Sequence, residues 1–376
     1  MAPRRSERPE RDDRAERQER PERPERPERP ERPERPERPE RPGRAARAER
    51  PLPPVEEVRP GLWSVPVPLP GLPRYVVVYV METPRGPYII DTGWDNDDSY
   101  AGLACGLAQL GTSVADIRGV VVTHAHFDHY GLAGRVRAES GAWVSLHPLD
   151  AAVLSEWETD AAQRHLDILV VAGAPDHVVE AAAQLARPGE RIELPRPDLL
   201  LEDGERPPVP GWNLRAVWTP GHSPGHLCFW DEDRELLFSG DHVLPRFPVG
   251  MHDSGYDGDP LTDFLGALDR LEELDPDEVL PAHEHRFTDL GPRLVTLREH
   301  HERRLAQTMD AVCAGASTVW EVASRTTRRP LESVSGFPLQ SLLVDATAYL
   351  NALRTRGELR SEPPRRGRPA RWFPAP

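Results

Sequence analysis

Hydrophobic and polar positions alternate in short, distinct patterns along most of the chain. Short apolar runs rich in β-branched and aromatic residues, separated by proline and glycine, predict strands in the first half. These strands cover residues 62–69, 75–83, 87–91, 118–123 and 142–147. Helices are predicted between them, from about Ser99 to Leu110 and in the segment that ends at Gly141. This alternation of strands and helices is typical of an α/β fold.

A second set of strands follows in the middle of the chain. The expected elements are a strand, a hairpin across an acidic turn, a helix and a short final strand: 213–219, 227–230 with 236–239, 261–274 and 279–280. Between the two sets, residues 160–185 are helical in pattern and are broken at Gly173-Ala174-Pro175. This segment is either a packed pair of surface helices or a lid over a binding site.

The pattern becomes mainly helical from Leu297 onward. Helices are predicted at about 297–314, 318–324 and 339–355, followed by two short strands at 358–361 and 370–373. Three helices and a hairpin suggest a winged helix, with a structural or dimerising cap as the alternative. We therefore expect three parts: a tail over residues 1–54, a catalytic domain over 55–295 and a C-terminal domain over 296–376.

The N-terminal tail has no apolar pattern that could contribute to a core. From Glu19 to Pro42 it is an unbroken Glu-Arg-Pro repeat, which offers nothing to bury against the entropy cost of ordering. Proline at every third position favours polyproline II. The sequence predicts a disordered, semi-stiff and well-solvated spacer.

Charge is distributed unevenly around the total of -15. Residues 1–51 have 17 arginines against 14 acidic residues, residues 52–295 have 17 against 40, and residues 296–376 have 13 against 8. The acidic middle part would repel a polyanion unless a local feature such as bound metal reverses the field. The basic C-terminal part keeps nucleic-acid binding open as an alternative.

Residue usage excludes several other classes of chemistry. Cys105, Cys228 and Cys313 form no C-x-x-C pair, so no disulfide framework or thiolate zinc site is indicated, and a reducing cytoplasm fits. The chain has no lysine, which excludes lysine nucleophiles and Schiff bases. The longest apolar runs, such as Tyr75 to Met81, are far too short to span a membrane, so we expect no membrane association.

The strongest chemical signal directly follows the predicted strand at 118–123. The sequence Thr-His-Ala-His-Phe-Asp-His places four candidate metal ligands on one loop: His124, His126, Asp128 and His129. Loops at the carboxyl ends of strands are where α/β sheets form their sites. His124 and His126 share one side of an extended chain, and Asp128 and His129 lie past the bend. The two pairs can therefore face two different ions, and imidazole and carboxylate ligands suit Zn²⁺.

This H-x-H-x-D-H motif resembles the metallo-β-lactamase superfamily, and four further elements resemble that family's landmarks in the same order. They are Asp91-Thr92-Gly93, the run from Thr219 to His226 (T-P-G-H-S-P-G-H), Phe238-Ser239-Gly240-Asp241, and Leu280-Pro281-Ala282-His283, which has alanine where glycine is usual. The resemblance implies an αββα sandwich for the middle domain. The C-terminal helices are similar to the winged-helix appendage of the branch that includes the human β-lactamase-like protein 2 endoribonuclease.

The resemblance also implies a ligand set. One ion is expected to bind His124, His126 and His222, and the other Asp128, His129 and His283, with Asp241 and a hydroxide shared between them. His283 is preferred over His285 because it directly follows the strand. Asp128 is also the expected catalytic residue, which orients the nucleophile and passes a proton to the leaving group. Asp91, His226 and His242 are expected to support the ligands without binding metal.

The leading hypothesis is a cytoplasmic hydrolase with two zinc ions per chain, whose bridging hydroxide attacks a small ester, thioester or lactone. The alternative is a nuclease or phosphodiesterase that uses the basic C-terminal domain to hold RNA or DNA. A non-enzymatic winged-helix binding module is a third hypothesis. Iron could replace zinc on the same ligands, although the flavodiiron branch usually has Glu where His126 stands. Glutathione-thioester hydrolases of the superfamily use C-terminal basic residues including lysine, and this chain has none.

Overall fold

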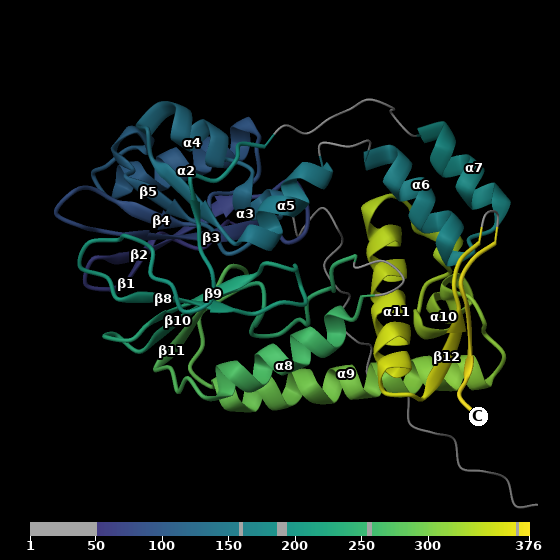
Figure 1. Cartoon of the computed structure of the whole chain (residues 1–376). Helices are drawn as coiled ribbons and strands as arrows, with labels where there is room; N and C mark the ends of the chain where they lie inside the picture. The colour runs from purple at the N-terminus through teal and green to yellow at the C-terminus, as the bar shows by residue number, and fades with distance from the viewer. Residues whose placement is uncertain (1–50, 158–160, 186–193, 254–257, 366–367) are drawn as a thin grey trace, which may run out of the picture. The chain divides into compact units, whose positions relative to one another are not determined.

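Two β-sheets form the centre of the fold in the computed structural model (Figure 1). The larger sheet has the strand order β1 (Glu56–Arg59), β2 (Leu62–Pro68), β3 (Tyr75–Met81), β4 (Tyr88–Ile90), β5 (Gly119–Val121), β6 (Trp143–Leu146) and β7 (Leu199–Leu200). The smaller sheet has the order β11 (Glu278–Pro281), β10 (Leu236–Gly240), β9 (Leu227–Asp231) and β8 (Leu214–Trp218). The predicted α/β class with strands in both halves is confirmed.

The structure describes residues 51–157, 161–185, 194–253, 258–365 and 368–376. Nearly all of the tail predicted over residues 1–54, including the Glu-Arg-Pro repeat, lies outside these ranges, so its disorder remains a prediction. Leu52–Pro376 forms one compact unit. Within the described residues, no helix combines the length and the apolar character needed to cross a membrane.

Both faces of strand β3 are buried, which explains why its sequence is a continuous apolar run. Val76, Val78 and Val80 point to one face and pack among helix residues such as Leu103 and Leu107. The residues between them, such as Tyr79, point to the other face and pack against the second sheet. Because side chains alternate across a strand, burial on both faces removes the polar positions of an ordinary surface strand.

Helices cover the outer face of each sheet and give the helix-sheet-sheet-helix layering that the sequence predicted. Helices α2 (Asp97–Gln109), α4 (Ala133–Ser140) and α5 (Pro148–Trp157) contribute buried residues to the cluster on the larger sheet. Helices α8 (Pro260–Glu272) and α9 (Leu290–Cys313) pack against the smaller sheet. Helix α5 and strands β1 and β7 have no counterpart among the elements predicted from the sequence.

The C-terminal elements lie where the sequence placed them. They are α9, α10 (Val319–Thr326), α11 (Phe337–Thr355) and a hairpin of β12 (Leu359–Glu362) and β13 (Arg371–Pro374). Thr318 and Glu321 form a capping box that fixes the start of α10. The winged-helix assignment itself remains a prediction.

These C-terminal helices share one hydrophobic cluster with the smaller sheet. The cluster includes Leu237 of β10, Phe264 of α8 and Leu343 of α11. The boundary expected between residues 295 and 296 falls inside α9, which continues without a break from Leu290 to Cys313. Sheet, helices and C-terminal elements therefore bury apolar surface together.

The segment between the two sets of strands forms two helices, α6 (Ala161–Ala172) and α7 (Asp176–Leu185), as predicted (Figure 1). Leu169 of α6 is fully buried in the cluster that includes α11. His165 Nδ1 on α6 also lies 3.3 Å from Gln340 Oε1 on α11. These contacts match the interpretation of α6 as a packed surface helix.

Candidate metal centre

The predicted ligands converge because the strands that precede them end at one edge of the two sheets. Strands β4 and β5 are parallel, and Asp91 and the H-x-H-x-D-H loop follow their carboxyl ends. Strands β10 and β11 are also parallel, and Asp241 and His283 follow them. Strand β8 runs antiparallel to β9, which is antiparallel to β10, so the loop with His222 begins at the same edge.

One group of histidines combines the H-x-H pair with the loop after β8. The nitrogen atoms of His124, His126 and His222 that can bind metal lie within 4.8 Å of one another. His124 Nε2 is 2.8 Å from His126 Nδ1. These are the three residues that the sequence assigned to the first ion.

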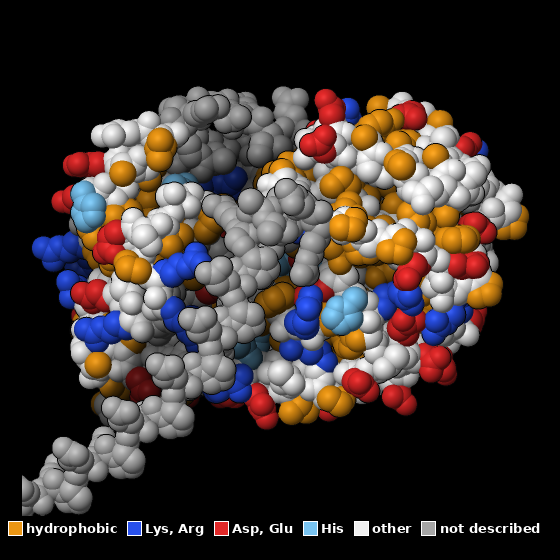
Figure 2. Space-filling view, turned by 180° about the vertical axis from the view of Figure 1, so that it is seen from behind, with side chains coloured by type: hydrophobic (Ala, Val, Ile, Leu, Met, Phe, Trp, Pro, Cys, Tyr) orange, Lys and Arg blue, Asp and Glu red, His pale blue; other side chains and the backbone are white. Residues whose placement is uncertain are grey.

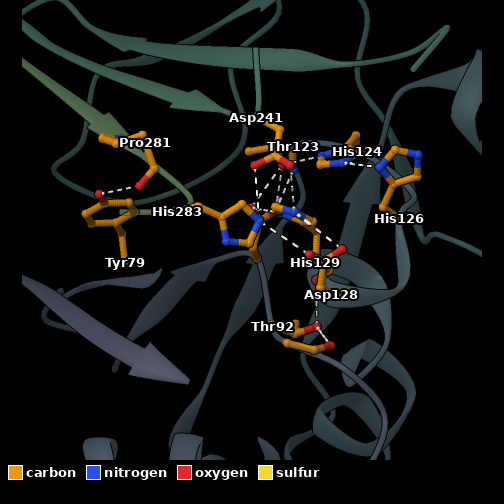
Figure 3. Close-up of polar contacts among 12 residues, drawn as sticks. Tyr79, Thr92, Thr123, His124, His126, Asp128, His129, Asp241, Pro281 and His283 are labelled. Carbon is orange, nitrogen blue, oxygen red and sulfur yellow. Dashed lines mark hydrogen bonds and ion pairs between the residues drawn. The ribbon is translucent and has the colours of Figure 1, made fainter. Parts of the chain in front are cut away.

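A second group comprises Asp128, His129 and His283, again with ligand atoms within 4.8 Å of one another. His283 Nε2 is 3.3 Å from Asp128 Oδ2, and His129 Nε2 is 3.6 Å from Asp128 Oδ1. The structure thus also brings together the three residues assigned to the second ion. In Figure 3, His283 and His126 lie on opposite sides of Asp241.

Asp241 lies between the two groups. Its carboxylate oxygens are 3.5 Å from His222 Nε2, 3.6 Å from His129 Nε2 and 3.3 Å from His283 Nε2. It therefore contacts histidines of both groups, as a ligand shared by two ions must.

Several buried atoms at this point lack a hydrogen-bond partner within the described part of the chain: His129 Nε2, His222 Nε2 and Asp241 Oδ1. Leaving a buried polar atom unsatisfied costs free energy, and three such atoms aimed at one space indicate a missing partner. Imidazole nitrogens and carboxylate oxygens together favour a cation such as Zn²⁺. The residues present therefore fit a metal centre.

The electrostatics differ between the two groups. Burial and the neighbouring His222 lower the pKa of His126 to about 3, so this ring is neutral at neutral pH. Burial opposes the charged form of His283 too, but Asp241 and Asp128 outweigh it and raise the pKa of His283 to about 10. Burial would raise the pKa of Asp128, but His129 and His283 hold it well below its usual range. The carboxylates are therefore ionised and face protonated rings.

Asp91 supports the metal loop in the way the resemblance implied. Its carboxylate accepts hydrogen bonds from the Thr123 amide at 2.8 Å and from the Thr123 hydroxyl at 2.9 Å. The same carboxylate lies 2.8 Å from His129 Nδ1. This contact fixes Nδ1 as the protonated nitrogen and leaves Nε2 directed at the metal groups.

His226 and His242, the two histidines expected to support the ligands, have different surroundings. His226 Nε2 accepts a hydrogen bond of 3.1 Å from the amide of Asp241, so it positions the shared carboxylate. Neither ring nitrogen of His242 has a hydrogen-bond partner among the described residues, and its ring packs against Phe264 at 4.3 Å. His242 thus belongs to the apolar packing behind the centre, with His226 in between at 5.7 Å.

His283 and His285, the two candidates for the last ligand, lie in different surroundings. His283 is buried, and its Nδ1 donates to the carbonyl oxygen of Tyr75 at 2.9 Å. The preceding strand end is fixed in turn by Tyr79, whose hydroxyl donates to the carbonyl oxygen of Pro281 (Figure 3). His285 is exposed and outside both groups.

Asp150 is a functional residue that the sequence analysis missed. It is fully buried at the start of α5 and accepts hydrogen bonds from the Ala125 amide at 2.7 Å, the Ser223 hydroxyl at 2.9 Å and the Gly225 amide at 2.6 Å. Ala125 lies between two ligands of the H-x-H pair, and Ser223 follows His222. Asp150 therefore ties the two loops of the first group together. An acidic residue in the first turn of a helix is an ordinary feature, so no signal in the sequence marked it.

Comparisons with known proteins agree with this geometry. The family model described as the metallo-beta-lactamase superfamily matches residues 71–283. The chain is 30% identical over 181 residues to "Acyl-coenzyme A thioesterase MBLAC2" of Homo sapiens, which covers 44% of this chain and 56% of that protein. It is also 30% identical over 181 residues to "Probable metallo-hydrolase YqgX" of Bacillus subtilis, covering 48% and 64%. The matched region thus spans less than two thirds of the length of these relatives.

Two solved structures are similar over most of the chain. A metallo-beta-lactamase family protein from Thermus thermophilus has a TM-score of 0.70 and 29% sequence identity, and the match covers 85% of this chain and 100% of that one. A beta-lactamase domain protein from Burkholderia ambifaria has a TM-score of 0.71 and 25% identity, with 85% and 94% covered. With the family model matched over more than half of its length, including most strands of its two sheets and its buried His/Asp centre, this chain belongs to the metallo-beta-lactamase superfamily.

Proposed function

We propose that this chain is a metal-dependent hydrolase that uses two zinc ions to cleave a small thioester, ester or lactone. The observation that carries the proposal is the position of Asp241 between two groups of buried ligand atoms, several of which have no hydrogen-bond partner in the described residues. Three histidines on one side and Asp128 with two histidines on the other supply enough donors for two ions. Iron could bind the same ligands, and elemental analysis distinguishes the two metals.

Two ions held by these groups would lower the pKa of a shared water towards neutrality and polarise the scissile carbonyl. The residues of the chain would then orient the reactants. Because the pKa of Asp128 is held low, its carboxylate stays ionised at neutral pH and can accept a hydrogen bond from the attacking water. The carboxylate would take a proton from this water as it attacks and pass that proton to the leaving group.

A thioester is the substrate class that we favour. The human thioesterase among the relatives is 30% identical to this chain over 181 residues. A thiolate leaving group has an ordinary pKa near 8.5, so it makes a small demand on proton donation and suits a site without lysine. Glutathione thioesters are not expected, because the lysine that glutathione-specific members use is missing.

Exposed apolar side chains support an acyl substrate. Leu72, Trp94 and Phe247 are large hydrophobic residues with exposed fractions of 79%, 38% and 62%. Trp94 directly follows the Asp91-Thr92-Gly93 turn, and its ring lies 5.5 Å from that of Phe127, which is within the H-x-H-x-D-H loop. We propose that Trp94, which lies beside this loop, contacts the acyl group of the substrate.

The test is a thioesterase assay on the full chain loaded with zinc, in which the thiol released from acyl-coenzyme A substrates is measured. Loss of a supporting group commonly costs about 10–100-fold in metal affinity or activity, so His126→Ala should lose more than about 100-fold. His285→Ala is the matched control and should retain activity, because His285 is exposed and outside both groups. Wild-type protein with two zinc ions that is inert on thioesters, esters and lactones would refute the proposed substrate class.

A phosphodiesterase is the second candidate, because of the arginines on the C-terminal hairpin. Arg360, Arg368 and Arg371 are exposed there, and the Arg360 guanidinium lies 4.6 Å from the ring centre of Phe373. Figure 2 shows basic side chains among acidic and apolar ones on the face it presents. Binding through these residues should weaken steeply with salt. RNA binding that is missing, or that salt does not change, would exclude this candidate.

A further inference from the structure

The loop that carries His222 is connected by hydrogen bonds to the C-terminal helix α11. His222 Nδ1 donates to the carbonyl oxygen of Gly250 at 2.7 Å. This bond fixes the tautomer of the ring, so that Nε2 is free of its proton and faces the first metal group. The position of one peptide group, between Gly250 and Met251, therefore determines how His222 is presented.

That peptide group is held from the C-terminal region. The amide of Met251 donates to Asp345 Oδ1 at 2.9 Å, and Asp345 lies on α11, 94 residues further along the chain. A β-carbon at Gly250 would lie 3.4 Å from this carboxylate oxygen, so glycine allows the loop to lie close against the helix. The Met251 side chain is itself buried in the cluster shared by α8, α9 and α11.

The other side of the His222 loop is held by different groups. His252 donates from its amide and its Nδ1 to the carbonyl oxygen of Gly221, at 3.0 and 2.9 Å. Asp150 accepts from Ser223 and Gly225, as described above. Without Asp345, the segment from Gly250 to His252 would still contact the loop but would lose its hydrogen bond to α11.

The surroundings of Asp345 indicate a role at the metal centre. Among the described residues, the Met251 amide donates a hydrogen bond to Asp345, and the positive charge of Arg304 acts on its carboxylate. Burial raises the pKa of Asp345 to about 6. Asp345 is half-buried, and its carboxylate contacts the amide of the peptide that orients His222. This contact gives Asp345 a role in holding the metal centre.

We infer that Asp345 is a positioning residue for the metal centre, which acts through the Gly250–Met251 peptide on His222. The C-terminal helices are then part of the apparatus that forms the first metal group. This inference rests on the proposed binding of metal by His222, and it does not depend on which substrate is cleaved.

The test is a stepwise titration of the metal-free full chain with Co²⁺, followed by visible absorption, and with Zn²⁺ in competition with a chelator. Asp345→Leu removes the acceptor and fills the space, so the chain should fold, as judged by circular dichroism. Affinity for one of the two ions should fall about 10–100-fold, the usual effect of losing a supporting hydrogen bond. Asp345→Asn keeps an oxygen that can accept from Met251 and should bind both ions within a few-fold of wild type.

Asp310→Asn is the matched control, since Asp310 is an exposed acidic residue of α9. It should not change the affinity for either ion. The inference is overturned if folded Asp345→Leu binds both ions as tightly as wild type, or if Asp345→Asn loses as much affinity as Asp345→Leu. If Asp345→Leu does not fold, Asp345→Ser takes its place, because its shorter side chain cannot reach the amide. A folded Asp345→Ser that binds both ions as tightly as Asp345→Asn would then overturn the inference. Failure of wild-type protein to bind two ions would instead refute the proposed function.

Discussion

At the residue scale, three carboxylates that lie outside the predicted ligand set hold the loops that carry it. Asp91 fixes His129, Asp150 joins the loops on either side of the first group, and Asp345 holds the peptide whose carbonyl oxygen accepts a hydrogen bond from His222. Asp91 and Asp150 contact a ligand or residues next to one in the sequence, and Asp345 contacts the peptide that accepts from His222. The orientation of the imidazole rings is therefore determined largely by acidic residues one step removed from the metal position.

We predict that Asp150→Ala lowers the free energy of unfolding by about 2 to 4 kcal/mol, because the buried amides of Ala125 and Gly225 lose their acceptor. Urea denaturation of the full chain measures this change. Asp150→Asn retains an acceptor oxygen and should lose less. An alanine variant as stable as wild type would show that Asp150 does not hold the two loops.

Metal binding should release protons at neutral pH. Asp241 and Asp128 raise the pKa of His283 to about 10 against the opposing effect of burial, whereas a histidine must lose this proton to bind metal. Apparent affinity should therefore rise with pH as long as the pH is below about 10. Calorimetric titrations in buffers of different ionisation enthalpy measure the protons released. The same binding enthalpy in every buffer would contradict this charge assignment.

At the scale of elements, strand ends explain how residues nearly 200 positions apart meet. The five motifs follow strands β4, β5, β8, β10 and β11. Within each sheet these strands run in the same direction, since β8 and β10 are both antiparallel to β9, and their carboxyl ends share one edge. The turn after β8 is tight, since Gly221 has a φ of +129°. A β-carbon there would lie 2.5 Å from the β-carbon of Phe264 on α8. Glycine is thus required both by conformation and by space.

Gly221→Ala should weaken metal binding and lower stability, because the new methyl group must displace either the His222 loop or α8. Gly266→Ala is the matched control within α8, where an added β-carbon meets no atom within 4 Å. That control should stabilise the protein by about 0.5–1 kcal/mol through helix propensity. Thermal unfolding and metal titration of both variants measure the two effects. If Gly221→Ala and Gly266→Ala had the same thermal stability and the same metal affinity, the close packing inferred at Gly221 would be contradicted.

The sequence predicted the elements that bear a strong local signal. The β3 run, the break at Gly173 and the motif from His124 to His129 each combine residue type with spacing, and the structure has the corresponding elements. Asp150 and Asp345 could not be predicted, since each resembles an ordinary helical acid until the chain folds. Their roles depend on partners 25 and 94 residues away, a relation that no local pattern encodes.

At the scale of the whole molecule, one hydrophobic cluster joins the smaller sheet to the C-terminal helices. Its buried members come from β8–β11, from α8 and α9, and from α10 and α11. The change to a mainly helical pattern at Leu297 led us to expect a domain boundary at residue 295, which lies within α9. The helix in fact begins at Leu290 and continues across this position.

A chain that ends at residue 295 should therefore lose cooperative unfolding and tend to aggregate. It would keep only the first turns of α9 and would expose the side of the cluster that α11 covers. Denaturation followed by circular dichroism, together with light scattering, tests this expectation. A truncated chain that unfolds cooperatively and binds two ions would show that residues 296–376 are an independent domain and would also count against the role of Asp345.

The central claim, that seven side chains hold two ions, is tested most directly by counting metal in the purified full chain. Elemental analysis after dialysis against zinc should find two ions per wild-type chain and clearly fewer in His126→Ala, which lacks a ligand of the first group. His285→Ala should again retain two. A wild-type chain that retains no zinc, iron or other divalent metal after this treatment would contradict the account of the buried centre.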